Sequence, residues 1–213
     1  MKNVRITFSK TGRAKFISHL DLNRAMIRAL RRAMVPVWYT EGFNRHPYVT
    51  FAAPLSLGYE GLAESMDLRL EEDLPMNELV SRLNAVMPEG LIVTGADEAV
   101  MKPGDLQAAR YRLTFSCDAE ALQNLLQQDS ICVEKRTKKG GTKTVDLKPA
   151  LQDMTVSAKD AGTQLEVTLP CGSADNLNPG LLLTALQQQT GDETLQMTVL
   201  RLELYGPDGK IFA

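Results

Sequence analysis

One short pattern of residues occurs twice in this chain and constrains its fold more than any other feature. The segment at residues 4–9, VRITFS, returns as YRLTFS at residues 111–116. In each copy apolar and polar residues alternate, which is the period of a half-buried β-strand. A helical pattern follows each copy. The repeat therefore predicts two similar α+β halves in a chain of 213 residues.

The first half is predicted to have the element order β-α-β-β-α-β. The expected strands are residues 4–9, 37–51 with an interruption at 42–47, 65–70 and 91–93, and the expected helices are residues 19–33 and 77–87. Ser18 can cap the first helix, with Asp21 returning the bond, and Pro36 ends it. This order is that of the ferredoxin-like split βαβ unit.

The second half is predicted to follow the same order with one addition. Its expected strands are residues 111–116, 131–135, 165–169 and 197–204, and its expected helices are residues 119–128 and 179–189. Residues 135–164 add a basic hairpin tip and a further strand near 154–158. We therefore expect an α+β protein of two tandem ferredoxin-like (βαββαβ) domains, residues 1–101 and 102–213.

Positive charge is concentrated near the start of the chain, although the whole protein has a net charge of −2. The first 48 residues hold ten Lys and Arg residues but only Asp21 and Glu41 as acids. A second basic island, residues 135–148, holds six basic residues and only Asp146. Such segregation indicates a surface that meets a polyanion or an acidic partner, with a solvated face as the alternative.

The predicted helix 19–33 has an apolar side and an arginine side. By the 3.6-residue period, four arginines fall on one stripe opposite the apolar residues: Arg24, Arg28, Arg31 and Arg32. We call these four residues the arginine stripe. Arg grips phosphate with a planar fork and stacks on bases. The stripe favours a nucleic acid or another phosphate-bearing partner, against a solvated face or one that binds an acidic protein.

The segment 41–48 combines a glycine, aromatic rings, a basic side chain and an imidazole. Four of its residues are expected to contact nucleic acid: Phe43, Asn44, Arg45 and His46. This mixture suits splayed single-stranded bases, which stack on aromatic rings. In the alternative the segment is a turn, with Phe43 and Tyr48 in the core and a local turn bond from Asn44.

Residues 135–143, which we call the lysine finger, predict a hairpin tip with a Gly-Gly turn. Its basic residues are candidates for contacts with backbone phosphates: Lys135, Arg136, Lys138, Lys139 and Lys143. A cationic finger of this kind contacts phosphates without reading sequence. The alternative is a solvated loop that its lysines keep soluble.

His19 and His46 are the only histidines of the chain. Near one phosphodiester, and with Lys or Arg to stabilise the developing charge, they could act as general acid and base in RNA cleavage. Each could equally be a structural hydrogen-bond donor. Two histidines without a nearby carboxylate cluster make a poor metal site, so no metal is expected.

Other features argue against several classes of protein. The three cysteines, Cys117, Cys132 and Cys171, form no C-x-x-C pair and have no His nearby in sequence. We therefore expect no zinc site, iron–sulfur cluster, disulfide framework or other cofactor. No run approaches the ~18 apolar residues of a membrane span. The N-terminus lacks the apolar region of a signal peptide, so a cytoplasmic protein without membrane contact is expected.

Several motifs follow one another in the first 58 residues. They are F-S-K-x-G at 8–12, F-I-S-H-L-D-L-x-R at 16–24, R-A-L-R-R-A at 28–33, G-F-N-x-H-P at 42–47 and F-A-x-P-L-x-L-G at 51–58. Together they resemble an uncharacterised bacterial family of radical SAM-linked proteins. Arg45 departs from the proline usual at its position. Members of this family occur alone or fused to the C-terminus of radical SAM proteins. The resemblance therefore implies a radical SAM enzyme as the partner.

These observations favour a non-catalytic RNA-binding or substrate-presenting accessory module that acts with a radical SAM enzyme. The arginine stripe and the lysine finger are expected to share one cleft. Two alternatives stay open. One is a metal-independent endoribonuclease that uses His19 and His46, so enzymatic activity itself is left open. The other is a protein-interaction domain whose arginines dock on the radical SAM partner.

Overall fold

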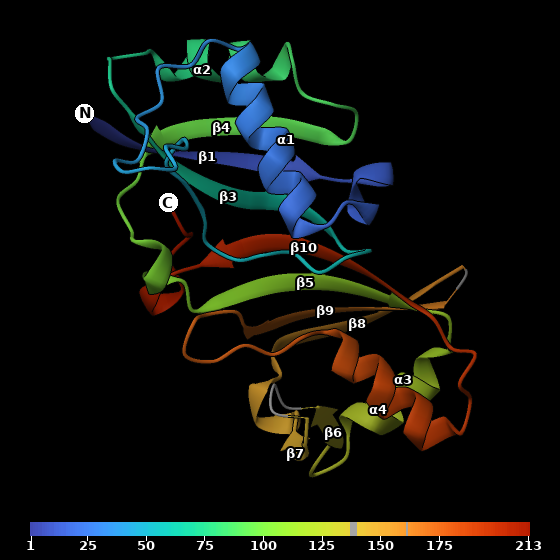
Figure 1. Cartoon of the computed structure of the whole chain (residues 1–213). Coiled ribbons are helices and arrows are strands. Elements are labelled where there is room, and N and C mark those ends of the chain that lie inside the picture. Colours follow the sequence, from blue (N-terminus) through green and yellow to red (C-terminus); the bar gives the residue numbers. More distant parts are fainter. Residues whose placement is uncertain (137–139, 161) are drawn as a thin grey trace. The chain divides into compact units, whose positions relative to one another are not determined.

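The computed structural model describes residues 1–136, 140–160 and 162–213 (Figure 1). Within them the chain divides into two compact units. Unit 1 consists of residues 1–107 and 201–213, and unit 2 of residues 108–200. Each unit combines helices with β-strands, which confirms the predicted α+β class. The first segment of unit 1 ends close to the predicted boundary at residue 101.

Unit 1 contains strands and helices in the order β-α-β-β-α-β. They are β1 (Lys2–Lys10), α1 (His19–Arg32), β2 (Val49–Phe51), β3 (Glu60–Leu70), α2 (Met76–Asn84) and β4 (Leu91–Glu98). The central strand β1 pairs antiparallel with β3 on one side and with β4 on the other, and β2 pairs antiparallel with β3. The last part of β10 (Met197–Tyr205) also belongs to this unit and follows β3 in the strand order.

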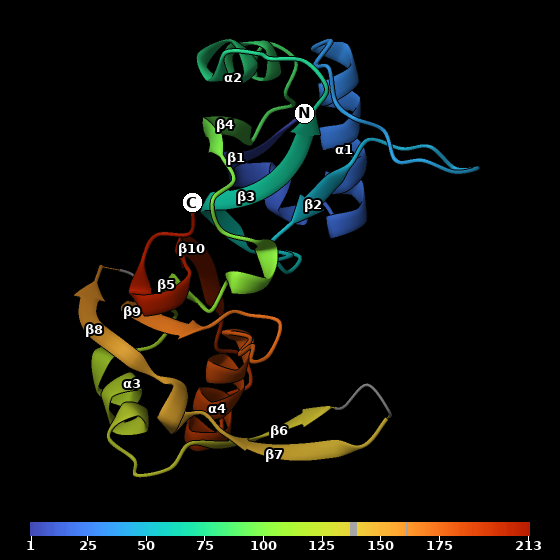
Figure 2. The same cartoon turned by 90° about the vertical axis from the view of Figure 1, so that its left-hand side faces the viewer.

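The core of unit 1 lies between its helices and one face of its sheet. Val4, Ile6 and Phe8 of β1 are buried against apolar residues of α1 and α2, such as Met26 and Leu79. Figure 2 shows α1 on one side of β1 and β3. Successive strand residues face opposite ways, so the residues between these apolar ones face the side away from α1.

The predicted strand at 37–51 is a strand only at its end. β2 covers Val49–Phe51, whereas Val37 and Tyr39 make isolated bridges, to Leu70 and Pro47. Pro36 and Pro47 have no backbone N–H to donate to a ladder, so continuous pairing through this segment is not possible.

Unit 2 repeats the arrangement and adds a hairpin. Its elements are β5 (Ala108–Phe115), α3 (Ala119–Leu126), β6 (Cys132–Arg136), β7 (Thr142–Asp146), β8 (Gln152–Lys159), β9 (Gly162–Pro170), α4 (Gly180–Thr190) and the first part of β10. β9 pairs antiparallel with β5 and with β8, and β10 adjoins β5.

The predicted strand at 131–135 forms, but it does not join the main sheet of unit 2. In the described residues β6 pairs with β7 as a separate two-stranded sheet, and β8 lies beside β9. Most residues of β6 and β7 are exposed, and Val133 is buried. A mostly polar pair of strands has too little apolar surface to be held inside a core.

The two copies of the sequence repeat form similar cross-strand ion pairs. Arg5 of β1 lies opposite Asp67 of β3, and Arg112 of β5 lies opposite Glu166 of β9. Each arginine forms an ion pair with its cross-strand partner, with Nε to carboxylate distances of 2.7 Å and 2.8 Å. The repeated arginine therefore occupies the same position in both units.

The C-terminal segment lies with unit 1, whereas the prediction placed it in a second domain of residues 102–213. Residues 201–213 belong to unit 1. Arg201 is buried in an ion pair with Glu64 of β3. The guanidinium carbon of Arg5 lies 3.8 Å from the centroid of the Phe212 ring. These contacts are long-range in sequence, so a repeat of local patterns could not indicate them.

Candidate nucleic-acid interface

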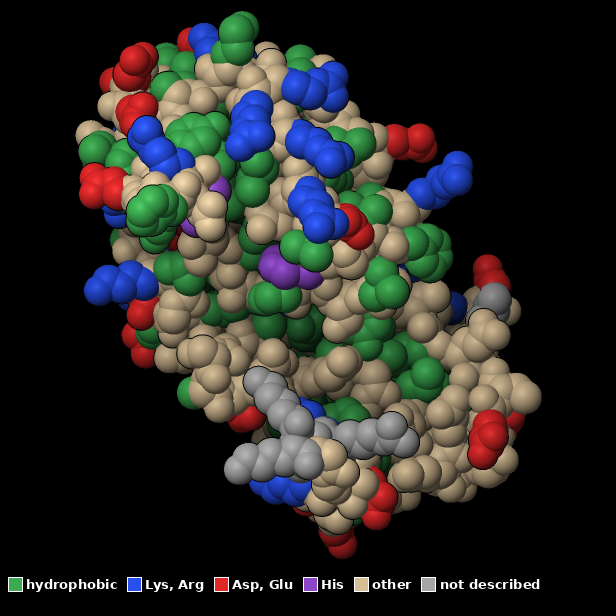
Figure 3. Space-filling model, viewed as in Figure 1, with side chains coloured by type: hydrophobic (Ala, Val, Ile, Leu, Met, Phe, Trp, Pro, Cys, Tyr) green, Lys and Arg blue, Asp and Glu red, His purple; other side chains and the backbone are tan. Residues whose placement is uncertain are grey.

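The arginine stripe lies along the exposed side of α1. All four of its residues are exposed, whereas Leu22, Met26 and Leu30 of the same helix are buried. The predicted cap is present, because Ser18 Oγ accepts a hydrogen bond from the Asp21 backbone N–H at 3.1 Å. Figure 3 shows basic side chains in a column over α1. The amphipathic pattern of the helix therefore fixes where the arginines lie.

The four guanidinium groups differ in the hydrogen bonds and ion pairs that they make within the chain. Arg24 Nη1 lies 3.1 Å from Asp21 Oδ1, an exposed ion pair. Arg32 Nη1 makes a long contact of 3.5 Å to the Val86 carbonyl oxygen. The guanidinium groups of Arg28 and Arg31 make no hydrogen bond or ion pair with any other described residue. Two planar forks on one helical face are thus available to a ligand.

Asp21 is the only acid on α1. Hydrogen bonds from Ser18 and from Arg24 hold the pKa of this carboxyl group below its usual value, and the charges of Arg24 and Arg28 act in the same direction. The carboxylate is therefore ionised at neutral pH and neutralises part of the stripe near the start of the helix.

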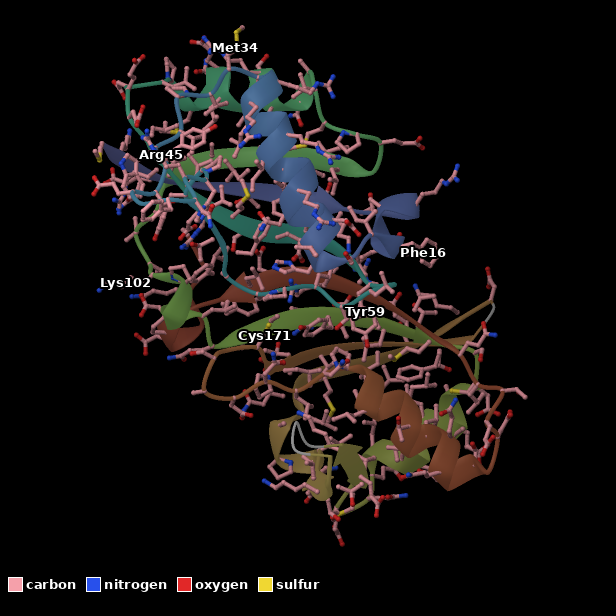
Figure 4. All side chains as sticks on the ribbon, in the orientation of Figure 1. Phe16, Met34, Arg45, Tyr59, Lys102 and Cys171 are labelled. Carbon is pink, nitrogen blue, oxygen red and sulfur yellow. The ribbon has the colours of Figure 1, made fainter. Side chains whose placement is uncertain are left out.

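The loop at 41–48 is exposed except at Pro47, and Phe43 does not fill the core as the alternative interpretation had it. Phe43 has a relative exposure of 109%. Asn44, Arg45 and His46 are exposed as well. Figure 2 shows the connection between α1 and β2 extending away from the rest of unit 1, and Figure 4 labels Arg45 within it. An uncovered aromatic ring in the same loop as an exposed arginine suits stacking with an unpaired base.

The base of this loop is held by a cation between two aromatic rings, which the sequence analysis missed. The guanidinium carbon of Arg69 lies 4.9 Å from the Trp38 ring centroid and 5.1 Å from that of Tyr48. The Tyr48 backbone N–H donates to the Trp38 carbonyl oxygen at 2.9 Å. Cation–π contacts of this kind stabilise the entry and exit of the loop. Trp38, the single tryptophan of the chain, is the feature of the sequence that could have indicated this contact.

His46 braces the tip of the loop. Its Nδ1 lies 2.9 Å from the Asn44 carbonyl oxygen and 3.1 Å from Thr40 Oγ1. A carbonyl oxygen only accepts, so the Nδ1–H group of His46 donates to it. The imidazole therefore has a structural role in the loop through Nδ1.

His19 lies in a different environment, at the first turn of α1. Its ring packs edge-on against Phe51, with 5.1 Å between centroids, and its Nδ1 is buried without a partner among the described residues. Burial lowers the pKa of His19, and the nearby Lys10 lowers it further. In the described part of the chain no hydrogen bond or ring contact joins His19 to His46. The geometry therefore gives no support to an acid–base pair.

A buried charged cluster near His19 also escaped the sequence analysis. Arg201 Nε donates to Glu64 Oε1 at 2.9 Å, and Lys10 Nζ donates to the Ile17 carbonyl oxygen at 3.1 Å. Burial lowers the pKa of Lys10, Glu64 opposes that change, and Arg201 adds to it. Only the burial of Lys10 could have been predicted from the sequence, because this residue continues the alternation of buried residues in β1.

The lysine finger is a β-hairpin as far as it is described. β6 and β7 pair antiparallel, and exposed Lys135 lies directly opposite exposed Lys143. Figure 2 shows the hairpin extending from the rest of unit 2. The candidates Lys138 and Lys139, and the side chain of Arg136, lie outside the described residues. The stripe belongs to unit 1 and the finger to unit 2, so a shared cleft stays a prediction.

Two further observations concern the whole described chain. Among residues 1–136, 140–160 and 162–213, no three His, Cys, Asp or Glu side chains are grouped so that they could hold a metal ion. No helix in these ranges combines the length and apolar character required for a membrane span.

Comparison with protein families gives one match. A family described as "Uncharacterized protein conserved in bacteria (DUF2344)" matches residues 3–179. No curated protein matches the chain at a significant level.

Solved structures show a distant likeness. A chain in a crystal structure of a Cbf5-Nop10-Gar1 complex is 9% identical, with a TM-score of 0.51, over 96% of this chain and 50% of that one. This chain thus spans about half of that protein's length, and the likeness shows the fold alone. An unknown protein from Galdieria sulphuraria is 11% identical over 94% of this chain and 98% of its own, but the TM-score of 0.28 is too low to indicate a shared fold.

Proposed function

This chain belongs to the DUF2344 family of proteins conserved in bacteria, and we propose that it is a non-catalytic RNA-binding or substrate-presenting module that assists a radical SAM enzyme in the cytoplasm. One observation carries the proposal. Arg28 and Arg31 are exposed on one face of α1 and make no ion pair with other described residues. Exposed arginines that have no ion-pair partner within the chain, at helical spacing, can bind the phosphate groups of a ligand.

The loop at 41–48 favours single-stranded RNA over a duplex as that ligand. Phe43 is uncovered by any neighbour in unit 1 and can stack on a base that is not already paired. Arg45 of the same loop is exposed, and its planar guanidinium group can also stack on a base. Phosphates on the arginine stripe and a base on Phe43 would together bind a short unpaired segment.

The lysine finger supports the same class of partner from unit 2. Lys135 and Lys143 repel each other across the β6–β7 ladder. A phosphate between them would remove that repulsion. Contacts of this kind hold the backbone of a nucleic acid and carry no sequence preference.

The strand order supports a tandem ferredoxin-like fold for this module. In unit 1, β1 lies between β4 and β3, with β2 beside β3. In unit 2, β5 lies between β10 and β9, with β8 beside β9. Both are the 4-1-3-2 order of a split βαβ unit, with the β6–β7 hairpin as an insertion.

A radical SAM partner is supported by the resemblance of residues 8–58 to radical SAM-linked proteins. The chain has no C-x-x-x-C-x-x-C motif. In this proposal the partner would carry the reaction, and this protein would bind or present the RNA.

The direct test is binding of fluorescein-labelled single-stranded RNA at several salt concentrations. We expect the affinity to fall as salt rises, with a log–log slope of about −0.7 for each phosphate contact. The double variant Arg28→Gln, Arg31→Gln should flatten the slope by about 1.4, since two contacts are lost. A flat slope for the unaltered protein would exclude the proposal.

Lys102→Gln is the matched control. Lys102 is exposed in unit 1 but lies on the 3₁₀ turn after β4 rather than on α1 (Figure 4). Neutralising it removes one positive charge without touching the stripe. An equal loss of affinity in this control and in an Arg28→Gln single variant would indicate an effect of net charge alone.

A second candidate function is docking on the partner protein, and an apolar group at the start of α1 favours it. Phe16, Leu20 and Leu57 are 67%, 57% and 64% exposed. The Gly58 backbone N–H donates to the Lys15 carbonyl oxygen at 2.8 Å, which holds Leu57 near Phe16. Co-purification with the radical SAM enzyme that survives nuclease but fails in Leu20→Asp would favour docking. Loss of the complex on nuclease treatment would favour RNA.

A further inference from the structure

A cavity of about 210 Å³ lies in unit 1, on the face of the sheet away from α1. Arg5, Thr7 and Ser65 line it, and they alternate with core residues of β1 and β3. Its remaining walls include the acids Asp97 and Glu203 and an apolar group that consists of Ala63, Leu204, Ile211 and Phe212. The cavity takes no part in the proposed RNA surface.

Two buried polar groups of this cavity have no partner among the described residues. They are Arg5 Nη1 and Ser65 Oγ, in residues that are only 2% and 6% exposed. The rest of the Arg5 fork is used, since Nε and Nη2 bind the Asp67 carboxylate at 2.7 Å and 2.8 Å. A buried donor without an acceptor is unfavourable, because it has lost its hydrogen bonds to water. The site therefore favours a ligand that brings an acceptor.

The same cavity also has two acidic side chains, Asp97 and Glu203. Asp97 lies next to Arg5 in the β1–β4 ladder, yet the Arg5 fork turns to Asp67 on the other side. Neither Asp97 nor Glu203 forms an ion pair with any described residue. This partly open cavity thus combines buried groups that can donate to an acceptor with more accessible carboxylates that can meet a cation.

We propose that this cavity binds a free α-amino acid. Its carboxylate would accept hydrogen bonds from Arg5 Nη1 and Ser65 Oγ, and its ammonium group would lie near Asp97 and Glu203. The Phe212 side of the cavity would take an apolar side chain. The volume agrees with a ligand of this size, because it exceeds the ~30 Å³ of a water molecule and is below the roughly 300–1,000 Å³ of sites for drug-sized ligands.

Isothermal titration of the full chain with L-leucine, L-serine and L-lysine tests the proposal. At least one of them should bind with a 1:1 stoichiometry. Its amide and its N-acetyl derivative, which each lack one charge, should bind at least about tenfold more weakly. No binding of any of the three at millimolar concentration would overturn the proposal and leave a water-filled cavity. Equal binding of the blocked derivatives would also overturn it.

Asp97→Asn and Ser65→Ala assign the binding to this cavity. Each should weaken the amino acid about tenfold, because each removes one group that meets a charge of the ligand. Glu98→Gln is the matched control, since Glu98 is the exposed neighbour of Asp97 in β4 and does not line the cavity. Unchanged affinity in both cavity variants would refute the assignment, whatever the outcome of the RNA titration.

Discussion

Lys135 of β6 and Lys143 of β7 are direct cross-strand partners in the two-stranded ladder of unit 2. Like charges in this position destabilise a sheet. Both side chains are exposed, so water weakens the repulsion, but direct cross-strand partners lie closer than a Debye length of about 8–10 Å and part of it remains. The Lys135–Lys143 pair therefore lowers the stability of the hairpin. An anion bound by both ammonium groups would offset that cost.

Lys143→Glu should therefore change stability and binding in opposite directions. The new pair with Lys135 is attractive, so the hairpin should gain about 0.2–1 kcal/mol. RNA affinity should fall, because a phosphate contact is replaced by a repulsive charge. Chemical denaturation and RNA titration of the same sample measure the two effects. Lys159→Glu, on exposed β8, is the control, and an equal loss of affinity there would argue against a specific role for the finger.

Asp21→Asn should increase RNA affinity. The substitution removes the one negative charge of α1 and releases Arg24 from its 3.1 Å ion pair. One additional contact should steepen the log–log salt slope by about 0.7. The free energy of unfolding should fall slightly, because a negatively charged side chain near a helix N-terminus stabilises the helix. Glu72→Gln removes an exposed charge outside the helix. If it raised affinity equally, the effect would be one of net charge.

Local patterns were sufficient for much of the fold and for the arginine stripe. The Ser18 cap and the 3.6-residue period place α1 and its two sides without any knowledge of neighbours. The alternation in residues 4–9 and 111–116 likewise placed β1 and β5. In each case the signal lies within a few residues of the feature that it predicts.

Long-range contacts could not be predicted in the same way. Glu64 and Arg201 are 137 residues apart in sequence, and no local period connects them. The two aromatic rings around Arg69 come from separate segments. The strand at 132–136 has ordinary strand character, and only its partner determines that it forms a hairpin outside the main sheet. Pairing, rather than propensity, decides such features.

Glu64→Gln should destabilise unit 1 strongly. Arg201 is 3% exposed and Glu64 is 4% exposed, so the substitution leaves a buried guanidinium without its counter-charge. Losing one member of such a pair costs about 3–5 kcal/mol. Chemical denaturation measures the change. Glu166→Gln, which breaks the more exposed pair with Arg112, should cost about 1 kcal/mol or less. Similar losses in both variants would contradict this difference.

The apolar double variant Glu64→Leu, Arg201→Met should recover most of that loss. The two apolar side chains remove the carboxylate and the guanidinium together and leave Lys10 as the one charge of this cluster. Replacing a buried ion pair by apolar residues of similar volume is often neutral or stabilising. A double variant as unstable as Glu64→Gln would show that the other contacts of Arg201, including its 2.8 Å hydrogen bond to the Ala53 carbonyl oxygen, carry the stability instead.

His19 should make the stability of the protein depend on pH. Burial and the charge of Lys10 lower its pKa in the folded state, whereas the unfolded chain has a pKa of about 6.5. Below about pH 6.5 the unfolded state binds more protons than the folded state. The free energy of unfolding contributed by this group is therefore full above that pH and falls as the solution becomes more acidic.

His19→Phe should remove this contribution, since a phenyl ring can pack against Phe51 without titrating. The measurement is the free energy of unfolding between pH 5 and pH 7.5, where the variant should show a smaller slope than the unaltered protein. Proton NMR of the His19 ring gives a direct check. A titration midpoint at or above 6.5 would mean that the imidazole is not held in its neutral form by burial.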